Sequence, residues 1–330
     1  MSKEIKIIEY DNSYEEKWDK FVLNESANGT FLQTRNFLLY HPKGKFEDSS
    51  LLFMNGNTIV AVLPAHIERQ GEIIRLLSHQ GSTFGGIVVG KSFCNVSYVE
   101  LILSRFEEYI IEKGFTEIVL KQTSLIYQKT DSNLIDYFLY INGYECSQEL
   151  GYYIDFNEYN KDIISNFSSS RRRDYRYSLK NNFAFRQLQT EKEIHDFYII
   201  LCDNYMKFHE TPVHTIEELL NFKYSRIPQN VDFYGVYMED ELIAGGMVFL
   251  FTNEIMHTQY LAVRQEHSNL FANEFLYTNI IETARRKGFK KLSFGTSTLE
   301  EGKVLNRSLA LYKEGFGTKE YINFHYIKNV

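Results

Sequence analysis

The densest group of anion-binding side chains is a basic segment near the middle of the chain, residues 168–180. It reads Ser-Ser-Ser-Arg-Arg-Arg-Asp-Tyr-Arg-Tyr-Ser-Leu-Lys, with Arg171, Arg172 and Arg173 directly after the serines. Serines cap helix starts, helix starts attract anions, and guanidinium groups match phosphate or carboxylate geometry. Two interpretations stay open: a clamp for a phosphorylated acceptor or the end of a tRNA, and a solvated helix that connects two lobes.

A second group of polar side chains lies in the apolar segment Met256–Leu261. Strand alternation would place His257 and Gln259 on one face and Tyr260 on the other. Burying such groups without partners is costly, so they are candidates for substrate binding or proton transfer. The structural alternative is that their hydrogen bonds are satisfied within a core.

The elements that must position these residues follow the same order in both halves of the chain. Each half has three strands, a helix, a strand, a helix and a last strand, which predicts an α/β protein. Gly288 follows Gly114 by 174 positions and Gly315 follows Gly143 by 172, each at an expected helix end. We therefore expect a duplication, with lobes at 1–157 and 158–330 joined through the basic segment. The predicted strands are 51–54, 58–68, 73–78, 115–120 and 144–156, then 231–238, 242–251, 254–263, 290–294 and 318–327; the main helices are 96–113, 133–141, 272–287 and 304–313.

Composition limits the classes of protein and of partner. The 330 residues, 44% of them hydrophobic, are enough for two domains with real cores. A formal charge of −7 argues against DNA as a partner. Three separated cysteines without a CxxC pair predict neither a zinc site nor disulfides. No apolar run is long enough to span a membrane and the N-terminus reads as a strand, so we expect a cytoplasmic protein without integral membrane contact.

Four short motifs occur within this duplicated order: Phe294-Gly295-Thr296-Ser297, Lys313-Glu314-Gly315-Phe316-Gly317, Ser170-Arg171-Arg172-Arg173 and Phe31-Leu32-Gln33-Thr34. The order of elements resembles the GNAT acyltransferase fold, and its duplicated form with these motifs resembles the FemAB-like family of double-GNAT aminoacyl and acyl transferases. The resemblance implies two tandem GNAT-like lobes, each a mixed, mostly antiparallel sheet flanked by helices. Two features differ from relatives: Ser293 stands where the family often has Asp, and 264–273 lacks the glycines that hold a coenzyme A pyrophosphate in single-domain GNAT proteins.

The resemblance also implies roles for residues of these motifs. Lys313 would lie near the reacting groups, where it stabilises an oxyanion or grips a carboxylate or phosphate; a solvated lysine at a helix end is the alternative. Tyr312 would be an acid toward the leaving group, and the strand with Gln259 and Tyr260 would line the donor cleft. The remaining candidate substrate-binding residues are Gln33 and Thr34 on the acceptor side, with His257, Gly295, Ser297, Arg171, Arg172 and Arg173.

The expected reaction is transfer of an acyl or aminoacyl group to an amine by direct attack. The donor would be acyl-CoA or aminoacyl-tRNA, without a metal or a tightly bound cofactor. The chain shows no nucleophile elbow and no Cys/His signature, which argues against a covalent intermediate. By resemblance the acceptor is a small molecule or a cell-envelope or peptidoglycan precursor. Two alternatives are an acyl-CoA N-acyltransferase acting on a sugar or small amine, and a catalytically inactive double-GNAT module that only binds a ligand.

Overall fold

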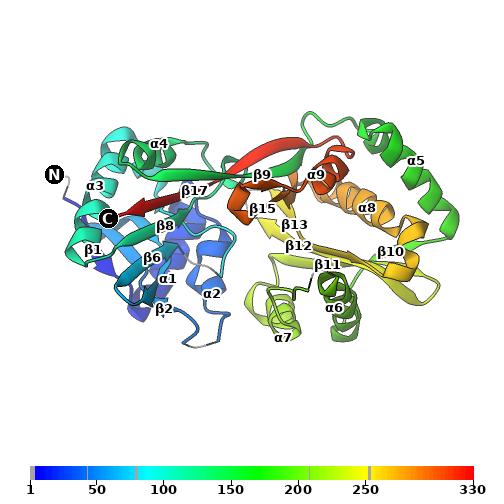
Figure 1. Ribbon diagram of the computed structural model, residues 1–330, viewed down its shortest axis with the longest axis horizontal. Coiled ribbons are helices and arrows are strands. Elements are labelled where there is room, and N and C mark those ends of the chain that lie inside the picture. Colours follow the sequence, from blue (N-terminus) through cyan, green and yellow to red (C-terminus); the bar gives the residue numbers. More distant parts are fainter. Residues whose placement is uncertain (1–3, 43, 79–80, 208, 252–253) are drawn as a thin grey trace. The chain divides into compact units, whose positions relative to one another are not determined.

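The computed structural model describes residues 4–42, 44–78, 81–207, 209–251 and 254–330 (Figure 1). Its contacts define a first unit, 1–149 with 300–303 and 322–330, and a second unit, 150–299 with 304–321. Strands β9 (Glu145–Asp155) and β17 (Lys319–Asn329) each begin in one unit and end in the other. The last strand of each sequence half thus contributes to the unit built by the other half. Whether 1–157 and 158–330 are separate domains stays a prediction.

The first unit contains two sheets. One has the order β1-β3-β4-β7. In the other, the end of β17 continues as β8-β6-β5-β2, and among the strand pairs that the structure describes there, β6 and β8 are parallel and the others antiparallel. Its strands are β1 (Lys6–Glu9), β2 (Glu47–Asp48), β3 (Leu51–Asn55), β4 (Thr58–Leu63), β5 (Ala65–Gln70), β6 (Ile73–Ser78), β7 (Val88–Val89) and β8 (Glu117–Lys121), and its α-helices are α1 (Glu15–Lys20), α2 (Arg35–Leu38), α3 (Val96–Glu112) and α4 (Leu134–Ile141).

Helix α3 supplies much of the core of the first unit. Its buried residues recur at helical spacing and belong to one hydrophobic cluster with strand residues of both sheets: Val99, Ile102, Leu103, Phe106 and Ile110. The sequence predicted this apolar face. The strand predicted at 58–68 is instead divided at Pro64 into β4 and β5, which belong to different sheets, because proline has no N–H for a continuous ladder.

The second unit is built on a sheet with the order β10-β11-β12-β13-β14-β9; among its described strand pairs, β13 and β14 are parallel and the others antiparallel. Helix α8 covers one face and α6 with α7 the other (Figure 1). Its strands are β10 (Ala184–Gln187), β11 (Val231–Met238), β12 (Glu241–Phe251), β13 (Ile255–Val263) and β14 (Lys291–Thr296), with a small hairpin of β15 (Thr298–Leu299) and β16 (Val304–Leu305); its α-helices are α5 (Ser169–Ser178), α6 (Glu191–Met206), α7 (Ile216–Asn221), α8 (Ala272–Arg286) and α9 (Arg307–Glu314).

Backbone conformation shows which glycines correspond in the two halves. Gly114 and Gly288 follow α3 and α8 with φ of 70° and 83°, and Gly143 and Gly317 follow α4 and α9 with φ of 82° and 73°. Gly315 has a right-handed φ of −58°. The partner of Gly143 is therefore Gly317 and not Gly315, and both glycine pairs are 174 positions apart. At this spacing Lys313 corresponds to Leu139, and Gly295 to Lys121.

None of the helices in the described ranges combines the length and apolar character that crossing a bilayer requires.

Candidate functional site

The candidate site begins where the two parallel strands of the second unit stop pairing. β13 pairs with β14 from Ile255 to His257 only, although both strands continue beyond this point. A β-bulge in β13 leaves Gln259 without a facing residue in β12 and interrupts the predicted alternation there. Bulges redirect side chains and end pairing, which suits the wall of a ligand site.

Lys313 lies at the end of α9 and points at the end of β14. It is only 3% exposed, and its Nζ donates to the carbonyl oxygens of Gly295 at 3.0 Å and Thr296 at 2.6 Å. Burial lowers the pKa of Lys313 to about 7. An ammonium has three N–H donors, and two carbonyls account for two of them. The third can bind a substrate oxygen.

In the first unit, the carbonyl that corresponds to that of Gly295 is hydrogen-bonded without a lysine. Leu139, which corresponds to Lys313, is fully buried. The carbonyl of Lys121, which corresponds to that of Gly295, accepts from the amides of Gly85 at 3.0 Å and Gly86 at 2.8 Å. Of these two matching positions, the one in the second unit carries the cation. This asymmetry favours the second unit as the place of chemistry.

Ser293 joins several polar groups beside Lys313. Its Oγ lies 3.1 Å from His257 Nδ1 and 3.2 Å from the hydroxyl of Tyr321, and it accepts from the amide of Gly295 at 3.2 Å. Burial, with the positive charge of Lys313, lowers the pKa of His257 to about 4. The imidazole is therefore neutral at pH 7. Ser293, which stands where the FemAB-like family often has Asp, therefore connects His257, Tyr321 and the Gly295 amide through an uncharged hydroxyl.

Two hydroxyls next to Thr296 have no hydrogen-bond partner among the described residues. They are Oγ of Ser297, which is 1% exposed, and Oγ1 of Thr298. Unsatisfied buried hydroxyls are costly, and functional sites are a common reason for them. Their position supports the prediction that Ser297 contacts substrate.

A pocket of about 440 Å³ lies between α5, the end of β13 and the start of α8. Arg171 lines it, with its guanidinium 4.4 Å from the ring centre of Tyr312 and in ion pairs with Glu274 and, at 3.4 Å, Asp174. The Tyr312 hydroxyl accepts from Asn273 Nδ2 at 2.7 Å. Burial, and after it the charge of Glu274, raises the pKa of Tyr312 well above its usual value. Tyr312 is therefore protonated, as the predicted acid must be.

The start of α8 differs from a pyrophosphate cradle. Glu274 is its third residue and is 7% exposed, so a carboxylate already lies at the positive end of the helix. Two cations, Arg171 and Lys207, are balanced in the pocket by Asp174 and Glu274. The glycine-free segment 264–273 therefore leads into the start of α8, where the Glu274 carboxylate makes binding of a further anion unfavourable.

The structure places other predicted residues elsewhere. Tyr260 contacts α6 and the segment before α7: its hydroxyl lies 2.7 Å from His214 Nδ1, and its ring packs on Tyr205. Burial raises its pKa. Of the other arginines, Arg173 pairs with Asp174 at 2.9 Å, and neither it nor Arg172 lines the pocket. Their predicted roles stay predictions.

Gln33 and Thr34 are buried in the first unit and serve its local structure. The amide of Gln33 accepts from the backbone of Thr30 at 2.8 Å and donates to Thr123 Oγ1 at 2.9 Å. Thr34 caps α2 through the amide of Phe37 at 3.1 Å. These bonds give both residues a structural role, and their predicted contact with an acceptor stays a prediction.

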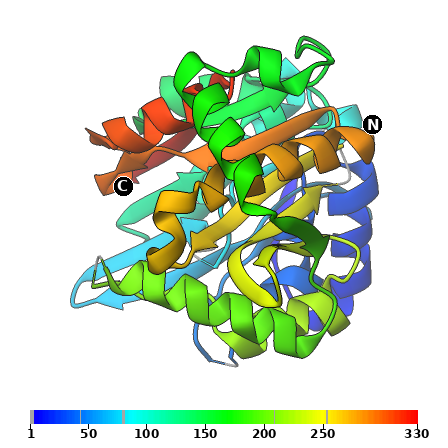
Figure 2. The same ribbon diagram turned by 90° about the vertical axis from the view of Figure 1, so that its right-hand side faces the viewer.

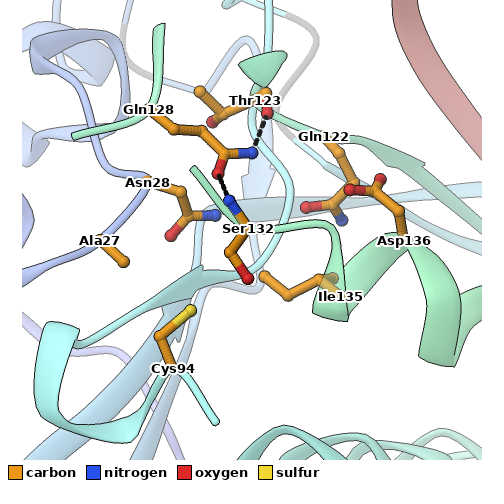
Figure 3. A pocket seen from close by; sticks show the side chains of 9 residues that line it. All are labelled: Ala27, Asn28, Cys94, Gln122, Thr123, Gln128, Ser132, Ile135 and Asp136. Atoms are coloured by element: carbon orange, nitrogen blue, oxygen red, sulfur yellow. Dashed lines mark hydrogen bonds between the residues drawn. The ribbon is translucent and has the colours of Figure 1, made fainter. Parts of the chain in front are cut away.

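A pocket of the first unit lies beside these residues (Figure 3). Gln128 bridges its wall by donating to the Thr123 carbonyl and accepting from the Ser132 amide. Nε2 of Gln122 and Oδ1 of Asp136 have no hydrogen-bond partner in the described structure. The volume of about 10 Å³ suits one water molecule and excludes a substrate.

Sequence reasoning missed several residues that build the site. Glu274 could have been found as an acidic residue in the first turn of a predicted helix. Its pairing with Arg171, 103 positions away, has no local signal. The same holds for Tyr321 and Asn273, which reach their partners only through the fold.

Solved structures share this architecture. FemX superposes with a TM-score of 0.68 at 10% identity, covering 98% of this chain and 97% of FemX. L-PGS from Bacillus licheniformis gives 0.60 at 11%, covering 96% and 92%, and a tandem GNAT protein from the clavulanic acid biosynthesis pathway gives 0.56 at 9%, covering 99% and 98%. The chain has the tandem GNAT fold. The predicted fold class and the FemAB-like architecture are thereby confirmed. No family model matches the sequence, and no curated protein matches it significantly.

Proposed function

We propose that this tandem GNAT protein is an acyltransferase that moves an acyl or aminoacyl group to an amine in its second unit. The observation that carries the proposal is Lys313, a buried lysine on the carbonyls of Gly295 and Thr296. Both carbonyls belong to β14, which stops pairing with its parallel neighbour β13 after His257. The name of a putative lysylphosphatidylglycerol synthetase, whose C-terminal domain has the same fold, agrees with aminoacyl transfer.

We propose the following course for the reaction. The acceptor amine attacks the acyl carbon, and a C–N bond forms while the carbonyl oxygen gains negative charge. The third N–H of Lys313 donates to that oxyanion. The intermediate then expels the thiolate or ribose hydroxyl of the donor. The amine passes its proton to solvent water. Tyr312 gives its hydroxyl proton to the leaving group and then regains a proton from water, so no net charge is left on the protein.

The start of α8 favours an aminoacyl ester of RNA over acyl-CoA as the donor. Glu274 occupies the positive helix end that GNAT proteins use for a pyrophosphate, and its carboxylate would repel one. The acceptor is an amine of a small molecule or of a cell-envelope precursor. The two earlier alternatives, an acyl-CoA N-acyltransferase and an inactive binding module, are outcomes of the test.

The test compares Lys313→Met with Lys192→Met, an exposed lysine of α6. Single-turnover assays use aminoacyl-tRNA or acetyl-CoA with a panel of amine acceptors. We expect aminoacyl-tRNA to be consumed, Lys313→Met to be slower by about 10²-fold or more, and Lys192→Met to match the wild type. Folding is checked by circular dichroism.

Two results would overturn the proposal. Full activity in Lys313→Met removes the lysine from the chemistry, and absence of turnover with every donor supports the inactive module. If acetyl-CoA binds saturably and is consumed, the donor is an acyl-CoA and not an aminoacyl ester of RNA.

A further inference from the structure

The outer face of α5 carries a row of cations that the proposed chemistry does not use. Arg172, Arg176 and Lys180 recur every four residues, and so lie along one side of α5 and the turn that follows it. Helix α5 crosses the front of the view in Figure 2. We infer that this row, the α5 basic row, docks the phosphodiester backbone of an RNA.

The row is free to bind. Arg176 and Lys180 are exposed and Arg172 is half-buried. In the described parts of the chain, neither arginine side chain has an ion-pair or hydrogen-bond partner. The opposite side of α5 holds the carboxylate of Asp174, which Arg171 and Arg173 already neutralise. The row therefore remains positive in a chain whose formal charge is −7.

An aromatic platform lies beside the row. Tyr177 is 44% exposed and stacks on Phe271 with ring centres 5.6 Å apart and planes inclined by 24°. The Nζ of Lys180 lies 4.8 Å from the centre of the Tyr177 ring. Exposed aromatic faces next to cations are the combination on which unpaired bases stack while the backbone is neutralised.

The length of the row favours RNA over a smaller anion. Eight helical positions span about 12 Å, which exceeds what one diphosphate group can bridge. An anionic membrane is the other extended partner, but a membrane-binding helix presents an apolar face. Tyr175 of α5 packs on Phe275 within the unit. Among the described residues of α5 and the turn after it, the exposed large apolar side chains are Tyr177 and Leu179, which are too few for such a face.

The experiment measures binding of a fluorescent RNA hairpin with a single-stranded 3′ end by anisotropy, from 50 to 300 mM salt. The triple variant Arg172→Ala/Arg176→Ala/Lys180→Ala is compared with Lys6→Ala/Lys17→Ala/Lys20→Ala, which removes three exposed cations from the first unit. We expect the α5 triple to bind at least about tenfold more weakly, with a log–log salt slope smaller by about two. We expect the control triple to match the wild type. Tyr177→Ala should weaken binding severalfold and leave the slope unchanged.

Several results would overturn the inference: equal losses in the two triples, no RNA binding at 50 mM salt, or α5-dependent binding to vesicles of anionic phospholipid in place of RNA. The proposed function enters this inference only in the assumption that the bound RNA carries the acyl group to be transferred. Lys313→Met separates the two ideas, because it should bind RNA normally and fail in turnover. If it remains active, the lysine's role fails and the docking surface stands; if it is inactive while the α5 triple binds RNA normally, the docking surface alone fails.

Discussion

Lys313 combines a chemical role with a cost to folding. Its ammonium is removed from water and has two neutral carbonyl oxygens as its recorded acceptors. Burial favours the neutral amine, which is why the pKa is lowered to about 7. In the unfolded chain the pKa is the ordinary lysine value of about 10.4. The two states therefore bind different numbers of protons between these values.

This difference predicts how stability depends on pH. Above pH 7 the unfolded lysine holds a proton that the folded one has lost, so the free energy of unfolding rises with pH until about pH 10. Lys313→Met lacks this contribution. Between pH 7 and 9 the wild type should gain about 2–3 kcal/mol relative to the variant, as measured by urea unfolding. A constant difference across this range would contradict the prediction.

Ser297 allows a second test at a single side chain. Its hydroxyl has no partner in the described structure, so Ser297→Ala should change stability by less than about 1 kcal/mol. If the hydroxyl binds substrate, KM should rise severalfold while kcat changes little. Ser293→Ala is the matched contrast, because it removes a hydroxyl bonded to His257, Tyr321 and Gly295. It should cost about 1–3 kcal/mol. Equal KM values for wild type and Ser297→Ala would remove Ser297 from the site.

At the scale of elements, the end of β14 is shaped by a glycine. Gly295 has a φ of 70°, which favours glycine, and its carbonyl holds Lys313. A Cβ there would lie 3.5 Å from His257 Cε1, an ordinary contact, so the cost of Gly295→Ala is mainly backbone strain. We expect a loss of about 1–2 kcal/mol in stability together with slower turnover.

Gly288→Ala is the control for this prediction. Its φ is 83° and a Cβ would meet nothing within 4 Å, so the strain is similar without a neighbour in the site. Thermal melts should show similar losses for both variants, while turnover should fall only in Gly295→Ala. Equal turnover in the two variants would show that the conformation at Gly295 does not position Lys313.

At the scale of the whole molecule, the exchange of last strands predicts which fragment can fold. Residues 151–155 of β9 pair with β14 in the second unit, and residues 325–329 of β17 pair with β8 in the first. Fragment 158–330 lacks β9, the antiparallel partner of β14, and carries the unpaired strand β17, so it should aggregate. Fragment 145–321 keeps β9 and should be monomeric with a cooperative melt. Size-exclusion chromatography and circular dichroism decide; a well-folded 158–330 would contradict the prediction.

The sequence alone determined the local elements and their order. Apolar periodicity indicates the buried face of α3 and the repeated order of elements. Glycine, which readily adopts positive φ, indicates where the helices end. Turn chemistry and helix spacing act over a few residues, so they can be read without a fold. The same signals, with the short motifs around Gly295 and Lys313, were enough to predict the tandem GNAT fold.

The tertiary structure decided what those elements do together. Only the fold brings Arg171 to Glu274 and Ser293 to Tyr321, assigns the ends of β9 and β17 to the opposite units, and buries Lys313 on two carbonyls. Leu139 and Lys313 hold matching positions in α4 and α9. Leu139 is a buried core residue, whereas burial lowers the pKa of Lys313. Burial and long-range pairing depend on residues far apart in the chain, and no local pattern encodes them.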